Sequence, residues 1–238
     1  MLLGTRFEAF MKESPVSVMV HGVLERTLDP GALDELFERT AEVQYTKDLL
    51  FSQCVHVMSD VVLDVSPTVG AWYQDHPGEL AVTRQAVYDK LKNIEPEVSA
   101  EVVRHSAREL APVLKAMKAT QKPWLPGYRV LVLDGNHLAG TEHRIFELRR
   151  TRAAALPGQC LALYDPELDL IVDVVPCEDA YAQERSLLAE VLRKVEKWDV
   201  ILADRNFCTT GFLFGIYLRD AFFVIRQHKS TLSWQLTG

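Results

Sequence analysis

The second half of the chain alternates short apolar runs with helical patterns in an order that few folds accommodate. Runs rich in aliphatic and β-branched residues occur at 128–138, twice within 159–177, at 198–207 and at 221–228. Helical patterns at 179–198 and 209–221 separate the last three runs. Three antiparallel strands followed by crossovers to two parallel strands predict an α/β fold with a five-stranded mixed sheet, in the order 3-2-1-4-5.

The first 120 residues read as mostly helical. One helix is expected at 32–43, with Leu33, Leu36, Phe37 and Val43 on its buried face. A long buried helix is expected at 46–65 and another at 95–118. The proline-rich stretch 122–127 reads as a linker. We therefore predict a helical, DNA-binding domain over 1–125 and a sheet domain over 126–238.

A helix-turn-helix is one interpretation of residues 66–94. Thr83 is the expected N-cap of its second helix, with apolar residues such as Val87 facing inward. The residues expected to face outward are of the types that contact base edges and phosphates: Arg84, Gln85, Tyr88 and Lys92. The alternative is an ordinary helical hairpin with a polar outer face.

Two aspartates end apolar runs of the predicted sheet, Asp134 in RVLVLDGNHL and Asp204 in WDVILADRNF. The 3-2-1-4-5 order makes their strands neighbours, so the two carboxylates are expected to meet and bind Mg²⁺ or Mn²⁺. With a third carboxylate such a site can hold two metals. Alternatively, Asp134-Gly135-Asn136 is a tight turn. Asp204 is alternatively a helix N-cap, although Thr209 and Thr210 are better placed for that role.

Charge and composition limit the function classes. The net charge is −7, but residues 101–152 contain ten basic and five acidic residues, a local +5 that leaves −12 elsewhere. That basic stretch is either a phosphate-binding surface or a solvated helix face.

The sequence has no apolar run long enough to span a bilayer and no signal-peptide pattern, so a cytoplasmic protein that does not enter membranes is expected. The four cysteines are widely spaced, which argues against a zinc site.

Several motifs together carry a family resemblance. They are LDGNHL, then TEHR and ELR, LPG, a Tyr-Asp-Pro hairpin, PCEDAYAQERSLL, ADRNFCT and FFVIRQH. Upstream, SPVSVMVHGVLE, LFERTAEVQYTKDLLFS and VYDKLKNIEPEVS extend the resemblance over nearly the whole chain. In this order the motifs resemble the DDE transposases of the insertion-sequence-4 family, whose catalytic domain has a ribonuclease-H-like fold.

The resemblance implies cut-and-paste DNA transposition. Such an enzyme binds the terminal inverted repeats, nicks them by metal-dependent hydrolysis and joins the 3′-hydroxyls to target DNA, as a dimer on double-stranded DNA. Asp134 matches the first catalytic aspartate and Asp204 the second, while Asn206 and Phe207 line the site wall. The basic residues Arg144, Arg149 and Arg150, which follow the first aspartate, are expected to contact DNA.

The third carboxylate departs from the family pattern. Family members carry it in a helix with a Tyr-x-x-Arg-x-x-x-Glu pattern, after a β-rich insertion, and this sequence contains no such pattern. We therefore expect a fragment truncated at its C-terminus, with an incomplete two-metal site, little strand cleavage and an uncovered sheet face. The candidate substitutes considered are Glu142, Glu147, Asp173 and Asp179, of which Asp173 is the strongest because it lies within a strand.

Three other readings stay open. One is a DNA-binding or dimerising inhibitor of transposition that acts without catalysis. It is alternatively a stand-alone metal-dependent nuclease, which needs a substitute third carboxylate. The last reading is a decayed gene product with no selected role.

Overall fold

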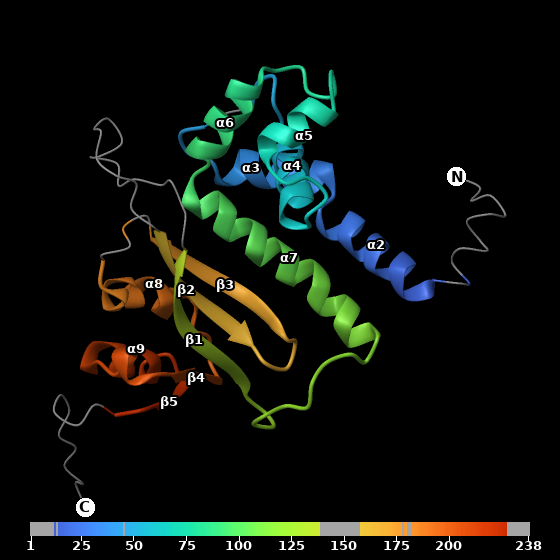
Figure 1. Cartoon of the computed structure of the whole chain (residues 1–238). Helices are drawn as coiled ribbons and strands as arrows, with labels where there is room; N and C mark the ends of the chain where they lie inside the picture. Colours follow the sequence, from blue (N-terminus) through green and yellow to red (C-terminus); the bar gives the residue numbers. More distant parts are fainter. Residues whose placement is uncertain are drawn as a thin grey trace, which may run out of the picture. The chain divides into compact units, whose positions relative to one another are not determined.

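The computed structural model describes residues 14–44, 46–138, 158–177 and 182–227, together with Lys12 and Asp179. It divides into two compact units, Met1–Val98 and Ser99–Gly238. Figure 1 traces the helical first unit in blue to cyan and the sheet of the second in yellow-green to red. The functional boundary expected at residue 125 stays a prediction.

Helices build the first unit, as predicted. They are α2 (Pro15–Thr27), α3 (Pro30–Thr40), α4 (Phe51–Val62), α5 (Val69–Asp75) and α6 (Arg84–Asn93). Their core gathers the apolar side chains Leu49, Cys54, Val57, Trp72, Leu80 and Val87. Helix α7 (Pro96–Ala116) begins at the end of this unit and continues in the second.

Two helix predictions for the first unit were too long. Helix α3 ends at Thr40, because the next residue, Ala41, is extended. Val43 therefore lies beyond the helix and is 83% exposed, which corrects its predicted place in the core. Helix α4 begins only at Phe51, where the Gln53 side chain accepts a hydrogen bond from the Leu50 amide. The apolar composition of the sequence alone did not predict where α3 ends or where α4 begins.

The second unit contains the predicted five-stranded sheet. Its strands are β1 (Arg129–Leu138), β2 (Gly158–Asp165), β3 (Leu170–Cys177), β4 (Asp199–Ala203) and β5 (Phe222–Ile225). Their order is β3-β2-β1-β4-β5, which confirms the 3-2-1-4-5 prediction and is the arrangement of a ribonuclease-H-like fold. Strand β1 pairs antiparallel with β2 and parallel with β4, and β4 pairs parallel with β5.

Helices α8 (Leu188–Lys194) and α9 (Thr210–Tyr217) share one apolar core with the strands. Residues from the helices include Leu188, Val191, Phe212 and Ile216, and those from the strands include Leu131, Leu133, Leu161, Leu163 and Ile201. The helix expected at 179–198 is shorter than predicted. A 3₁₀ turn, η2 (Glu184–Leu187), precedes α8, and the chain becomes extended at Val195. No helix in the described part of the chain is long and apolar enough to cross a bilayer.

Candidate functional site

Asp134 and Asp204 lie at neighbouring positions of two paired strands. The parallel register of β1 and β4 ends with Leu133 opposite Ala203, and the two aspartates are the next residue on each strand. Asp134 also pairs with Ala162 on the other side, within a strand that continues to Leu138. The tight-turn alternative for Asp134-Gly135-Asn136 is therefore wrong. The sheet thus brings together two residues that lie far apart in sequence.

Asp204 is held by the turn that follows it. It is the N-cap of a short 3₁₀ turn, η3 (Arg205–Phe207), and its Oδ1 accepts a hydrogen bond of 2.7 Å from the Asn206 amide. Thr209, as expected, caps the next helix, α9, by accepting from the Phe212 amide. The capping alternative for Asp204 therefore holds for η3. It does not exclude a metal-binding role, because the exposed carboxylate has a second oxygen.

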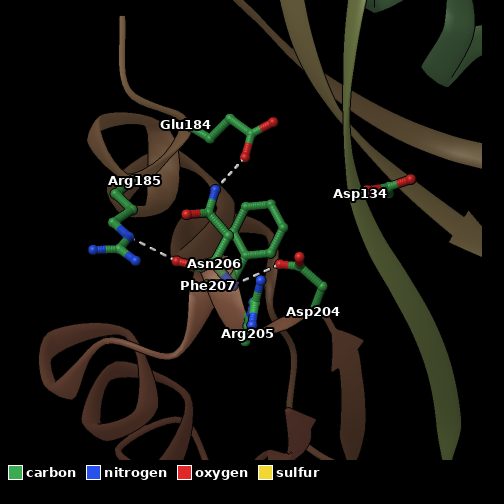
Figure 2. Close-up of a pocket in the computed structure, with 7 residues that line it drawn as sticks. All are labelled: Asp134, Glu184, Arg185, Asp204, Arg205, Asn206 and Phe207. Carbon is green, nitrogen blue, oxygen red and sulfur yellow. Dashed lines mark hydrogen bonds between the residues drawn. The ribbon is translucent and has the colours of Figure 1, made fainter. Parts of the chain in front are cut away.

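Both aspartates are among the residues that line one pocket. Figure 2 shows the residues that line it: Asp134, Glu184, Arg185, Asp204, Arg205, Asn206 and Phe207. They come from β1, from η2 and from the segment around η3. The pocket therefore contains a third carboxylate, that of Glu184, and two arginines. None of these three residues was a predicted site residue.

Glu184 is half-buried against the two turns and the strand. Its Oε2 accepts a hydrogen bond from the Asn206 side-chain amide. The next residue, Arg185, donates from Nε to the Asn206 carbonyl at 2.7 Å. On the strand side, a Cβ built on Gly135 would lie 1.9 Å from Glu184 Oε1. The Glu184 carboxylate therefore occupies the space above the glycine that follows Asp134.

The donor atoms suit a hard cation only in part. The pocket acids offer carboxylate oxygens, the ligand type that Mg²⁺ and Mn²⁺ prefer. Among the residues that the structure describes, however, no three His, Cys, Asp or Glu side chains are arranged to hold a metal ion. Gly135 faces Glu184, so strand alternation turns Asp134 to the opposite face of β1. Figure 2 accordingly shows the Asp134 side chain directed away from Glu184.

The acids considered as substitutes for the third carboxylate lie elsewhere or outside the description. Asp173 accepts an ion-pair hydrogen bond from Arg104 at 2.9 Å and pairs with Lys194, also at 2.9 Å, and it does not line the pocket. Asp179 is likewise absent from the pocket lining. Glu142 and Glu147 lie outside the described residues. Asp173 is therefore explained by its two cationic partners.

The predicted DNA contacts of the first unit are all exposed. Arg84, Gln85, Tyr88 and Lys92 face solvent on α6, whereas Val87 is buried. Thr83 caps this helix as predicted, accepting from the Ala86 amide at 3.2 Å. The Gln85 amide donates to Asp89 at 2.9 Å, within the same helix.

The remaining predicted DNA contacts, Arg144, Arg149 and Arg150, lie outside the described residues. Within the basic stretch, Arg104 and Arg108 both pair with Glu101 at 2.7 Å. That part of the stretch is therefore locally neutralised. Arg104 is also largely buried, with a side-chain exposure of 13%.

Sequence reasoning missed Glu184 because it falls within a pattern that reads as one continuous amphipathic helix. Its role depends on η2 meeting η3, which periodicity does not reveal. Two local signals were available. One is the Glu-Arg pair just ahead of an apolar helix, and the other is a glycine directly after a strand aspartate, where close approach by another group is common.

Comparison with known proteins adds little at the level of sequence. No protein-family model matches the chain, and no curated protein matches it. Among solved structures, it is similar to a chain in the cryo-EM structure of a piggyBac transposase synaptic complex with hairpin DNA, with a TM-score of 0.36 and 13% identity. The match covers 87% of this chain and 48% of that one, so this chain spans about half the length of the solved chain. At so low a TM-score, the fold assignment rests on this chain's own strand order and register.

Proposed function

We propose that this chain is part of a DNA transposase of the DDE type, related to the insertion-sequence-4 family. The observation that carries the proposal is the placement of Asp134 and Asp204 immediately after the last paired residues of β1 and β4. Two aspartates on neighbouring strands of a ribonuclease-H-like sheet, each just after the point where the β1–β4 pairing ends, suit phosphodiester chemistry, in which few protein groups are needed. The sequence motifs around both aspartates support the same assignment.

The proposed roles of the pocket residues follow from their chemistry. Asp134 and Asp204 would each donate carboxylate oxygens to Mg²⁺ or Mn²⁺, which when bound activates an attacking oxygen and stabilises the leaving one. Arg185 and Arg205, in the same pocket, would bind the phosphates that flank the scissile bond. Since the described residues do not complete a metal site, a further ligand has to come from elsewhere. We therefore expect this chain alone to cleave DNA slowly or not at all.

DNA recognition is proposed for α6. Its exposed Arg84, Gln85, Tyr88 and Lys92 would meet the bases and backbone of a terminal repeat, with Arg144, Arg149 and Arg150 as further contacts. A dimer on paired DNA ends and a cytoplasmic location complete the proposal.

The alternative is a regulator that binds the same DNA without cutting it. It is favoured by one observation, the absence of a three-ligand metal cluster among the described residues.

Mn²⁺ binding and DNA cleavage test the proposal together. We expect wild-type protein to bind Mn²⁺ weakly, with Asp134→Asn and Asp204→Asn each reducing affinity by roughly tenfold. Asp173→Asn is a matched control, because this aspartate lies outside the pocket and its loss should leave Mn²⁺ affinity unchanged. Equal Mn²⁺ binding by wild type and both site variants would contradict the metal site. Retention of terminal-repeat DNA by a protein that binds no Mn²⁺ would favour the regulator.

A further inference from the structure

Two short turns meet beside Asp204, and Asn206 has hydrogen-bond contacts with both Glu184 and Arg185 of η2. Turn η2 contributes Glu184, whose carboxylate accepts from the Asn206 side chain, and Arg185, whose Nε donates to the Asn206 carbonyl at 2.7 Å. Asn206 in turn donates its backbone amide to Asp204 Oδ1 at 2.7 Å. Figure 2 shows these contacts as a continuous path from η2 to the Asp204 carboxylate. Turn η2 therefore holds Asn206 at two points, its side-chain amide and its backbone carbonyl.

Each turn is anchored independently in the core. Phe207 at the end of η3 is 1% exposed, and Leu188 directly after η2 is 5% exposed, and both belong to the core that packs on the sheet. We therefore expect the fold to survive without the polar contacts between the turns. Those contacts decide only the local position of Asn206 and of the carboxylate that it holds.

Gly135 leaves room for the same arrangement because it has no side chain. It lies in regular strand β1 rather than in the left-handed region, so its backbone conformation does not call for glycine. The space does. A Cβ at this position would lie 1.9 Å from Glu184 Oε1 and 2.6 Å from its Cδ. Any side chain there would displace the Glu184 carboxylate from its contact with Asn206.

We propose that Glu184 is a positioning residue, which with Arg185 fixes Asn206 and thereby orients the Asp204 carboxylate, and that Gly135 is small in order to admit it. This inference rests on the proposed function, since it assigns Asp204 an orientation that matters for metal binding. Charge-assisted hydrogen bonds of this kind are stronger than neutral ones and restrict a short turn effectively. A direct ligand role for Glu184 is the competing assignment, and it requires the carboxylate to leave Asn206.

Four variants of the full chain separate these roles. Glu184→Ala removes the contact, whereas Glu184→Gln keeps a carbonyl oxygen that accepts from Asn206. Gly135→Ala leaves both turns unchanged in sequence but takes the space of the carboxylate. Glu190→Ala is the matched control, an acid that pairs with Arg193 on α8 and does not line the pocket. The readouts are hydrogen exchange at the Asn206 amide by NMR without metal, Mn²⁺ affinity, and the thermal midpoint.

We expect Glu184→Ala and Gly135→Ala to speed exchange at the Asn206 amide by roughly tenfold, the effect of losing one charge-assisted hydrogen bond. Both variants should also weaken Mn²⁺ binding by about fivefold or more, with the thermal midpoint little changed. Glu184→Gln keeps the contact as a weaker, neutral hydrogen bond and should stay within about threefold of wild type in exchange and in Mn²⁺ affinity, whereas Glu190→Ala should stay within about twofold.

Two results would overturn the inference. Unchanged exchange at Asn206 in Glu184→Ala would mean that the contact does not hold the turn. A loss of Mn²⁺ binding in Glu184→Gln as large as in Glu184→Ala would make Glu184 a ligand rather than a positioning residue. Failure of the proposed function is distinguishable from both. In that case Asp134→Asn and Asp204→Asn leave Mn²⁺ binding unchanged, while Asn206 exchange, which needs no metal, still responds to Glu184→Ala.

Discussion

Arg129 and Asp199 join the first residues of β1 and β4 by a bidentate ion pair. Asp199 is 1% exposed and accepts from Arg129 Nε at 2.7 Å and from Nη2 at 2.8 Å. Asp199 also accepts a hydrogen bond from the Glu196 amide at 2.8 Å. Its hydrogen-bond donors therefore lie at the start of β1 and just before β4. The hydrogen bonds that Arg129 donates to Asp199 raise the pKa of Arg129, which keeps the guanidinium ionised. Arg129 and Asp199 are the first pair of the β1–β4 register, whose last pair, Leu133 and Ala203, immediately precedes Asp134 and Asp204.

Asp199→Ala is expected to lower the free energy of unfolding by about 1–2 kcal/mol, because it removes a bidentate ion pair and leaves the Arg129 side chain, which is 40% exposed, without its main partner. Urea denaturation followed by circular dichroism measures the change. Glu196→Ala is the control, since this partner is 74% exposed and 3.4 Å from Arg129, and its loss should cost at most about 0.5 kcal/mol. Equal effects of the two substitutions would show that burial does not decide the strength of the pair.

Glu95 holds the loop after α3 through three backbone amides. Its carboxylate accepts from Glu42 at 2.8 Å, from Val43 at 3.0 Å and from Gln44 at 2.9 Å. Burial alone would raise the pKa of Glu95, but the hydrogen bonds from these amides lower it below its ordinary value. The ionised form is therefore the one that stabilises the loop.

The lowered pKa of Glu95 predicts a pH-dependent contribution to stability. It is fully present above the unfolded pKa of about 4.3 and is lost as pH falls through the lower folded value. Glu95→Gln should therefore destabilise the first unit by about 1–2 kcal/mol at neutral pH and by much less near pH 3. Denaturant titrations of both proteins at the two pH values measure this difference. A constant difference at both pH values would mean that the charge of Glu95 plays no part.

At the scale of elements, the strand order followed from the sequence because each strand carries its own apolar pattern. The runs around Leu131, Leu161 and Ile201 are buried as expected, and the crossover rules then leave few ways to order them. Helix ends were harder, because they depend on contacts rather than on composition. Val43 looked like a core residue by spacing, yet the chain turns extended at Ala41 and carries it into solvent.

The candidate site was predictable in its two aspartates and in two residues of its wall, Asn206 and Phe207, which line the pocket as expected. Asp134 and Asp204 each follow an apolar run, a pattern that is visible in sequence. Glu184 is brought to the pocket by a 3₁₀ turn that interrupts what reads as one helix, and no local pattern gives that interruption. The ion pairs of Asp173 with Arg104 and Lys194 could not be predicted either, since both basic residues are distant from Asp173 in sequence.

Helix α6 is the element on which DNA binding is proposed to depend. Arg84→Ala combined with Lys92→Ala should weaken binding to terminal-repeat DNA and reduce the slope of log affinity against log salt by about 0.9 for each lost phosphate contact. Fluorescence anisotropy over a range of salt concentrations measures both quantities. Lys47→Ala, which removes one exposed positive charge outside α6, is the control and should leave the slope unchanged. The same loss from Lys47→Ala would reveal a non-specific charge effect.

At the scale of the whole molecule, the β5 edge of the sheet leaves apolar side chains in solvent. Strand β5 is the last strand in the sheet order, and among the described strands it pairs only with β4. The exposed apolar residues nearby are Tyr217 (69%), Leu218 (77%), Phe222 (44%) and Val224 (60%). A sheet edge with free backbone groups and apolar side chains favours pairing with another chain.

Val224→Lys is therefore expected to reduce self-association of the protein, because a charge on an edge strand opposes edge-to-edge pairing. Light scattering across a concentration series measures the association, and the expected change is an apparent dissociation constant raised roughly tenfold, about 1.4 kcal/mol. Val62→Lys is the matched control, an equally exposed valine (74%) at the end of α4, and should change association little. Equal suppression by both lysines would mean that net charge, which moves from −7 toward zero in either variant, controls association rather than the β5 edge.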